Sequence, residues 1–258
     1  MTLDMDHLFG HLASQSELPK MKRLLVAPFQ LHTDMLLRIA NVGKAALQGQ
    51  QARIVIKMNA LTDLPLIEAL LDVPAGLQAR GTAVIAHPHP LFGGTMQNKV
   101  VQTLARAFVQ CGWQAVRFNF RGVGASAGTY EEGRGETSDM LAVIRQVAAE
   151  GPLALAGFSF GAFVTSQVVQ ALGAERPPEK LVLVGTAASR FAVAPIAPEL
   201  HERTLVLHGE QDDTVPLSSV MDWARPQSLP VMVIPGVEHF FHGQLPLLKS
   251  LVVRHLRA

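Results

Sequence analysis

The feature that most constrains this chain is a regular alternation of short β-rich runs and helical patterns that begins near Gly81. Such an alternation is typical of a mostly parallel sheet with helices on both faces. We therefore expect an α/β fold. The predicted strands are 82–86, 114–120, 153–157, 181–184, 204–207 and 231–234, and the predicted helices are 97–110, 136–149, 160–172 and 245–256.

The composition limits the classes of partner. A chain of 258 residues with 48% apolar and 17% charged residues can bury a large core in one domain with an appendage. Its net charge of +1 gives no basic field for nucleic acid or for an anionic membrane surface. We expect a small-molecule partner and leave a homodimer open. Residues 1–10 lack the basic cluster and apolar stretch of a secretory signal, so we expect a cytoplasmic protein.

Two further features have a structural and a functional reading. The segment 152–174 contains no charged residue and is about as long as a membrane span. Its internal glycine, serine and glutamine residues favour a buried strand followed by a buried helix instead. Cys111 has no partner for a disulfide and no neighbours at metal-ligand spacing, so we interpret it as a packing residue.

Two segments match the pattern Gly-x-Ser-x-Gly, in which a serine nucleophile is held on a turn between a strand and a helix. Segment 157–161 joins an apolar strand directly to an apolar helix and contains Ser159. Segment 124–128 contains Ser126, lies beyond the end of a strand and continues into a polar stretch. We therefore predict that Ser159 is the nucleophile and that Ser126 is a loop serine.

A serine nucleophile needs a histidine base, and the histidine needs a carboxylate that orients it. The loop after strand 204–207 contains three carboxylates, those of Glu210, Asp212 and Asp213. Loops at the carboxyl ends of parallel strands build the active sites of such sheets. We favour Asp212, from its spacing to the preceding glycine and the following Val-Pro pair, and keep Asp213 as the alternative.

The candidate base follows the last predicted strand, 231–234. His239 lies in the short loop directly after this strand, whereas His242 lies farther along the chain. The chain order Ser159, Asp212, His239 is the one expected when a Gly-x-Ser-x-Gly serine sits in an α/β sheet. Together the three features are a stronger signal than any one of them.

The oxyanion donors are expected to be backbone amides. The segment 87–95 follows the strand 82–86, where this architecture supplies one donor. Its two prolines, Pro88 and Pro90, have no N–H, so His89 is the predicted donor, with Phe160 as the second. The two histidines of the segment have no third ligand, so we expect no metal and no cofactor.

Three motifs resemble the small bacterial α/β-hydrolases of the dienelactone-hydrolase-like superfamily. They are the segments 87–99, 117–126 and 157–161. The resemblance covers about 66–258 and implies an α/β-hydrolase domain with esterase-type chemistry and the same serine, aspartate and histidine. Only about eighteen residues separate the strands 181–184 and 204–207, so we expect no lid domain. Arg190 and Phe191, in that connection, are predicted to line the site.

The segment 1–65 differs in character and resembles a fragment of polyphosphate kinase. The motifs that carry this resemblance are 24–29 and 52–63, and we expect a helix at 35–47 and a strand at 52–57. The resemblance ends near Leu70 and includes no phosphate-accepting histidine motif, so no kinase function is expected. Segment 67–72 is left open as a hydrolase strand or the end of a kinase-like helix.

The expected function is that of a serine hydrolase. It would cleave a carboxylic ester or thioester of a small molecule through an acyl-enzyme on Ser159. One alternative is a catalytically silent binding module that keeps the fold, and another is a phosphotransferase suggested by the N-terminal segment. The acyl and leaving groups are set by the pocket and stay open at this point.

Overall fold

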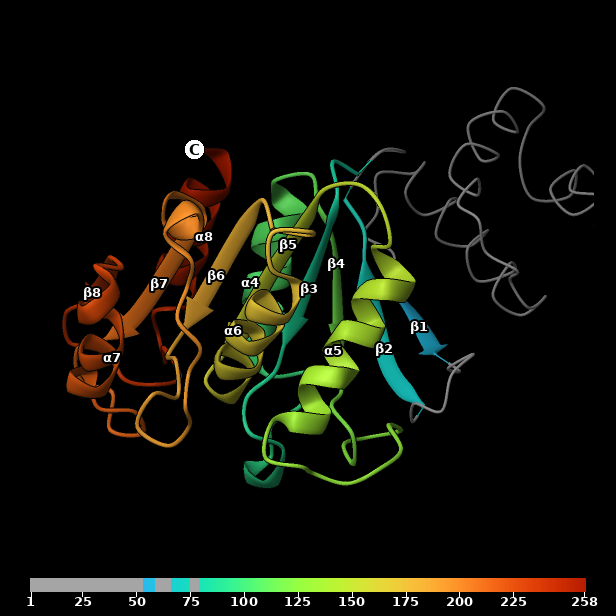
Figure 1. The fold of residues 1–258 in the computed structure, drawn as a ribbon, viewed down its shortest axis with the longest axis horizontal. Helices are drawn as coiled ribbons and strands as arrows, with labels where there is room; N and C mark the ends of the chain where they lie inside the picture. Colours follow the sequence, from blue (N-terminus) through green and yellow to red (C-terminus); the bar gives the residue numbers. More distant parts are fainter. Residues whose placement is uncertain (1–52, 59–65, 75–78) are drawn as a thin grey trace, which may run out of the picture.

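The computed structural model describes residues 53–58, 66–74 and 79–258, with the backbone alone for the first of these ranges. Its centre is an 8-stranded sheet in the order β1-β2-β4-β3-β5-β6-β7-β8 (Figure 1). Strands β3 to β8 run parallel to one another, whereas β1 and β2 are antiparallel to their neighbours. The strands are β1 (Arg53–Met58), β2 (Ile67–Asp72), β3 (Thr82–Ala86), β4 (Gln114–Phe118), β5 (Leu153–Phe158), β6 (Lys180–Val184), β7 (Thr204–Gly209) and β8 (Val231–Ile234).

Helices cover both faces of the sheet. Figure 1 shows α5 and α6 in front of the strands and α4 behind them. On the rear face α4 packs against α8, and on the front face α5 packs against α6. The helices are α4 (Lys99–Gln110), α5 (Arg134–Val147), α6 (Phe160–Leu172), α7 (Leu217–Ala224) and α8 (Leu245–Arg257), with 3-10 helices η1 (Pro90–Phe92), η2 (Pro198–Arg203) and η3 (Arg225–Gln227).

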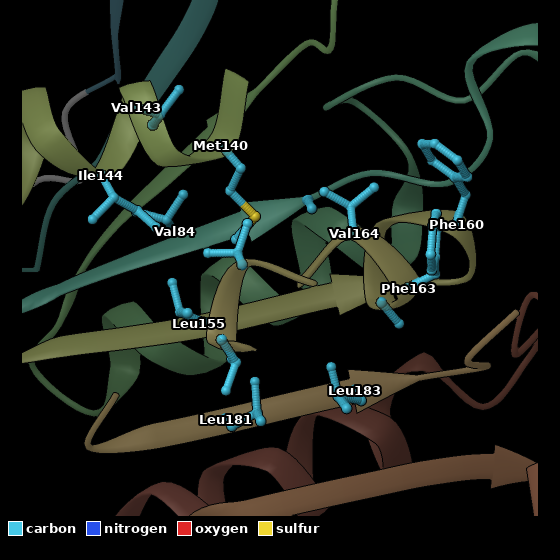
Figure 2. Close-up of a cluster of buried hydrophobic side chains, with 14 of the residues drawn as sticks. Val84, Met140, Val143, Ile144, Leu155, Phe160, Phe163, Val164, Leu181 and Leu183 are labelled. Carbon is cyan, nitrogen blue, oxygen red and sulfur yellow. The ribbon is translucent and has the colours of Figure 1, made fainter. Parts of the chain in front are cut away.

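The alternation of side chains along each strand divides the core between the two faces. On β3, Val84 joins the cluster beneath α5 and α6, whereas Ile85 joins the cluster beneath α4 and α8. Figure 2 shows the first cluster, with Met140 of α5 and Leu155 of β5 beside Val84. All five residues of β3 are buried, as expected for a strand in the middle of a sheet covered on both sides.

Most predicted elements are found with ends shifted by a few residues. The predicted strands 82–86 and 231–234 and the predicted helix 160–172 agree with β3, β8 and α6. Helix α7 was not predicted, because it has only 8 residues and buries only two of them. The uncharged segment 152–174 forms β5 and α6, and no helix in the described part of the chain is long and apolar enough to span a bilayer.

Strand β2 resolves the question left open for segment 67–72. The segment pairs antiparallel with β4, and Arg117 of β4 forms a buried ion pair with Asp72, with 2.7 Å from Nη2 to Oδ2. Glu68 accepts a hydrogen bond from the Asn119 side chain at 2.8 Å. On its other side β2 pairs with β1, so a strand of the kinase-like segment completes the sheet. The predicted helix 35–47 lies outside the described residues.

Candidate active site

Ser159 stands on the tight turn that joins β5 to α6. Its backbone has φ 56 and ψ −117, a conformation that a non-glycine residue adopts only under steric constraint. The two flanking glycines allow the turn to pack closely. A Cβ atom at Gly157 would lie 2.3 Å from the Gly161 carbonyl oxygen, and one at Gly161 would lie 2.4 Å from the Ala86 carbonyl oxygen. The turn therefore fixes the serine at the carboxyl edge of the parallel strands.

The structure brings Ser159, His239 and Asp212 together. The distance from His239 Nε2 to Ser159 Oγ is 3.0 Å, and that from His239 Nδ1 to Asp212 Oδ2 is 2.6 Å. The three residues come from loops after β5, β7 and β8, and all are buried, with exposed fractions of 7%, 6% and 1% for Ser159, Asp212 and His239. Because an ionised carboxylate only accepts, Nδ1–H donates to Asp212 and Nε2 is left to accept the serine proton.

The same geometry separates Asp212 from its alternatives. Asp212 Oδ1 accepts hydrogen bonds from the amides of Thr214 at 3.0 Å and Val215 at 2.7 Å, which hold the carboxylate in place. Asp213 is exposed and accepts a hydrogen bond from the hydroxyl of Thr214. Glu210 instead accepts a hydrogen bond from the amide of Gly236. Only Asp212, of the three carboxylates in this loop, contacts His239.

Two candidates set aside at the sequence level have structural contacts of their own. His242 is exposed and pairs with Glu238, with 3.0 Å between Nδ1 and Oε1. Ser126 is buried, donates to the Asn119 carbonyl at 2.7 Å and accepts from the Glu68 amide at 2.9 Å. The hydroxyl of Ser126 therefore ties β2 to the loop after β4.

His208 is a neighbour of the site that the sequence analysis did not single out. It is fully buried on β7, donates from Nε2 to the Val215 carbonyl at 2.9 Å, and lies 3.5 Å from Asp212 Oδ2. Burial lowers the pKa of His208, although the negative charge of Asp212 acts to raise it. A neutral imidazole thus supports the loop that carries Asp212. The signal available in the sequence was its position near the end of β7, four residues before Asp212.

The two predicted oxyanion donors come from the residue directly after Ser159 and from the loop that follows β3. Phe160 is the first residue of α6, where an amide has no partner within the helix. His89 caps η1, and its carbonyl accepts from the amides of Phe92 at 3.1 Å and Gly94 at 3.0 Å. The ring centroids of His89 and Phe160 are 5.0 Å apart, so both residues belong to one neighbourhood.

His87, the other histidine of this segment, uses both ring nitrogens within the protein. Nδ1 donates to the Pro88 carbonyl at 2.6 Å, and Nε2 accepts from the Phe120 amide at 3.0 Å. Among the described residues, no three histidine, cysteine, aspartate or glutamate side chains form a group that could hold a metal ion. Burial lowers the pKa of His87 to about 4, although the hydrogen bond to Pro88 acts to raise it.

This shift predicts a pH dependence of stability. The unfolded chain takes up a proton on His87 near pH 6.5, but the folded chain does so only near pH 4, so stability is lost as the pH falls between these values. Between pH 7 and pH 5, this difference in proton uptake by His87 should lower the free energy of unfolding by about 2 kcal/mol. Urea titrations should show this extra loss in the wild type relative to His87→Gln. Equal pH dependence in the two proteins would contradict the assignment.

Residues from the connection between β6 and β7 lie next to the predicted donors. The ring of Phe191 is 5.2 Å from that of Phe160 and 5.9 Å from that of His89. The guanidinium of Arg190 lies 6.0 Å from the ring of Phe92. Burial, followed by the charge of Arg190, lowers the pKa of His89. In this connection the only helix is η2, which leaves no lid domain over the site.

Comparison with family models gives two matches on different parts of the chain. The family described as serine aminopeptidase, S33, matches residues 78–200. Polyphosphate kinase C-terminal domain 2 matches residues 24–79. A polyphosphate kinase of Pseudomonas putida is 34% identical over 115 residues, which are 43% of this chain but only 15% of the kinase. The kinase similarity therefore covers a small part of that enzyme.

Other relatives match most of the chain. A protein of Rickettsia prowazekii is 31% identical over 182 residues, 62% of this chain and 71% of that protein. A Xanthomonas campestris α/β serine hydrolase without a lid has a TM-score of 0.70 and 33% identity, covering 80% of this chain and 94% of its own. An α/β serine hydrolase homologue from Coxiella burnetii has a TM-score of 0.65 and 36% identity, covering 80% and 97%. The chain therefore belongs to the α/β serine hydrolases.

Proposed function

We propose that this protein hydrolyses a carboxylic ester or thioester of a small molecule through an acyl-enzyme on Ser159. The observation that carries the proposal is the continuous hydrogen-bonded chain from Asp212 through His239 to the Ser159 hydroxyl. In such a chain the imidazole takes the serine proton, while the carboxylate fixes its tautomer and stabilises its positive charge. No cofactor is needed for this chemistry.

The reaction proceeds in two balanced halves. Ser159 Oγ attacks the carbonyl carbon as its proton moves to His239 Nε2, and the resulting oxyanion is held by the N–H groups of His89 and Phe160. Collapse of the tetrahedral intermediate breaks the bond to the leaving group, which departs as an alcohol or thiol with the proton from His239. Water then attacks the acyl-enzyme, gives a proton to His239 and releases the acid, and Ser159 regains its proton.

A peptide bond is the second candidate substrate, because the matching family is described as serine aminopeptidase. An aminopeptidase binds a positively charged α-amino group close to the scissile bond. The guanidinium of Arg190 lies 6.0 Å from the ring of Phe92, which is 4.7 Å from the ring of His89. Burial lowers the pKa of His89, and the positive charge of Arg190 lowers it further. Like charges repel each other, so this environment supports an ester or thioester over a peptide with a free amino terminus.

A substrate screen tests the proposal. The full chain and its Ser159→Ala variant are assayed against p-nitrophenyl esters of increasing acyl length, acyl thioesters and aminoacyl p-nitroanilides. We expect turnover of esters or thioesters by the wild type alone. Selective turnover of the anilides would establish the aminopeptidase instead. No turnover, together with no labelling of Ser159 by a fluorophosphonate, would favour a binding module without catalytic activity.

A further inference from the structure

The imidazole of His89 connects two segments that the proposed mechanism does not link. The Leu91 amide donates to its Nδ1 at 3.2 Å, and its Nε2 lies 3.2 Å from the hydroxyl oxygen of Tyr130. Because Nδ1 accepts a hydrogen bond, the proton of the neutral ring resides on Nε2. Nε2–H therefore donates to the Tyr130 hydroxyl, and the ring has a defined tautomer.

One end of this connection lies in the turn that carries a proposed oxyanion donor. The bond from Leu91 N–H to the His89 ring caps η1, while the His89 carbonyl accepts from two amides of the same turn. The side chain thus braces the turn from which the backbone N–H of His89 would bind the oxyanion. An N–H that is misdirected by an ångström loses much of its effect on a transition state.

The other end is fixed to the body of the protein. Tyr130 precedes Glu131, whose carboxylate forms an ion pair with Arg121, and Arg121 in turn pairs with Asp139 of α5 at 2.8 Å. Glu136 of α5 accepts hydrogen bonds from the amide of Glu131 at 3.0 Å and from that of Gly133 at 2.8 Å. The Tyr130 segment is therefore held against α5, and it offers a fixed partner to the His89 ring.

The pair also lies beside the second proposed donor. The Tyr130 ring is 4.9 Å from the His89 ring and 5.8 Å from the Phe160 ring. Burial and the charge of Arg190 lower the pKa of His89, whereas burial and the charges of Glu136 and Glu132 raise the pKa of Tyr130. Both side chains are thus neutral near pH 7, as their hydrogen bond requires.

We propose that the His89 imidazole and the Tyr130 hydroxyl act as a positioning pair that directs the His89 N–H toward the oxyanion. This inference rests on the proposed function, since it assigns a second role to a residue of the same site. The two side chains are positioning groups, because only the backbone of His89 would touch the reacting atoms. The bond between them sets the direction of that N–H and so contributes to kcat.

Two conservative variants remove the same hydrogen bond from opposite ends. Tyr130→Phe keeps the ring and removes the hydroxyl. His89→Asn keeps an oxygen that can accept from the Leu91 amide but is too short to reach Tyr130, and it leaves the backbone N–H in place. We expect each variant to lower kcat, and the rate constant for labelling of Ser159 by a fluorophosphonate, by about tenfold, with KM changed less than about twofold.

The double variant provides the sharpest comparison. If both substitutions remove one shared contact, Tyr130→Phe combined with His89→Asn should be no slower than the slower single variant. His89→Ala also removes the cap of η1 and should be slower still. Leu91→Ala is the control in the same turn, because it removes a side chain that is 67% exposed and retains its amide. We expect this control to match the wild type.

Each outcome bears on a different claim. Unchanged labelling and kcat in both single variants, or losses that multiply in the double variant, would overturn the positioning pair and leave the hydrolase intact. A loss confined to KM would likewise contradict a role in directing the oxyanion donor. Absence of labelling at Ser159 in the wild type would overturn the proposed function, and the positioning pair with it. Thermal unfolding of each variant shows whether a loss of rate reflects a loss of folded protein.

Discussion

Replacement of Ser159 by alanine is expected to lower kcat for ester hydrolysis by about 10⁵- to 10⁶-fold. The variant removes the atom that would form the acyl-enzyme, so water has to attack the substrate directly. His239 would lose its hydrogen-bond partner at 3.0 Å, but its bond to Asp212 would remain. Steady-state kinetics on the best ester of the substrate screen measure the effect, with burst-phase kinetics as a check for the acyl-enzyme.

Ser126→Ala is the matched control, because Ser126 occupies the centre of the other Gly-x-Ser-x-Gly segment. Its hydroxyl bonds to the Asn119 carbonyl and the Glu68 amide, both in the protein framework. We expect this variant to lose about 1–3 kcal/mol of stability, because removal of the hydroxyl leaves these two buried backbone groups unpaired. We expect its kcat per folded molecule to be unchanged. Loss of turnover in folded Ser126→Ala with retention in Ser159→Ala would reverse the assignment of the nucleophile.

The second large effect concerns the carboxylate. Asp212→Asn is expected to lower kcat by about 10⁴-fold, because an amide at this position no longer holds the imidazole in the tautomer with its proton on Nδ1 and cannot stabilise an imidazolium. The side-chain oxygen can still accept from the amides of Thr214 and Val215, so the loop should keep its shape. The measurement is kcat across pH 6 to 9, which separates loss of the base from a shift in its titration.

Asp213→Asn makes the same change in charge one residue farther along the chain. Asp213 is exposed and accepts a hydrogen bond from the Thr214 hydroxyl. We expect a kcat within about twofold of the wild type, since an exposed charge contributes little across solvent. Equal losses in the two variants would mean that the total charge of the loop matters and not the contact with His239. A larger loss in Asp213→Asn would move the role of the acid to that residue.

The sequence was sufficient for the parallel part of the fold. Short apolar runs separated by helical patterns predicted β3 to β8. The signal is clearest for β3 and β5, because strands buried on both faces are apolar throughout. The sequence also places Ser159, Asp212 and His239 each directly after a strand. Because these strands are parallel, their carboxyl ends lie at one edge of the sheet, and the three residues were expected to lie close together. The preference for Asp212 over Asp213 came from spacing alone, and in the structure Asp212 is the one that contacts His239.

The remaining features depend on contacts between distant residues. The pairing of β2 with β1 and β4 was uncertain, because the resemblance to the hydrolases begins near residue 66 whereas the resemblance to the kinase ends near Leu70. The bond between His89 and Tyr130 joins residues 41 positions apart in loops that have no periodic pattern. Helix α7 has only 8 residues and buries only two of them, so its apolar pattern in the sequence is too short to identify a helix.

If Ser159 is an activated nucleophile, it should react covalently with an electrophile that mimics the acyl substrate. The native protein is treated with a fluorophosphonate and digested, and the adduct is located by peptide mass spectrometry. The attack by Ser159 Oγ on phosphorus forms a P–O bond and releases fluoride, and His239 takes the serine proton. We expect a single adduct, on the peptide that contains Ser159. An adduct on Ser126, or none on the folded protein, would contradict it.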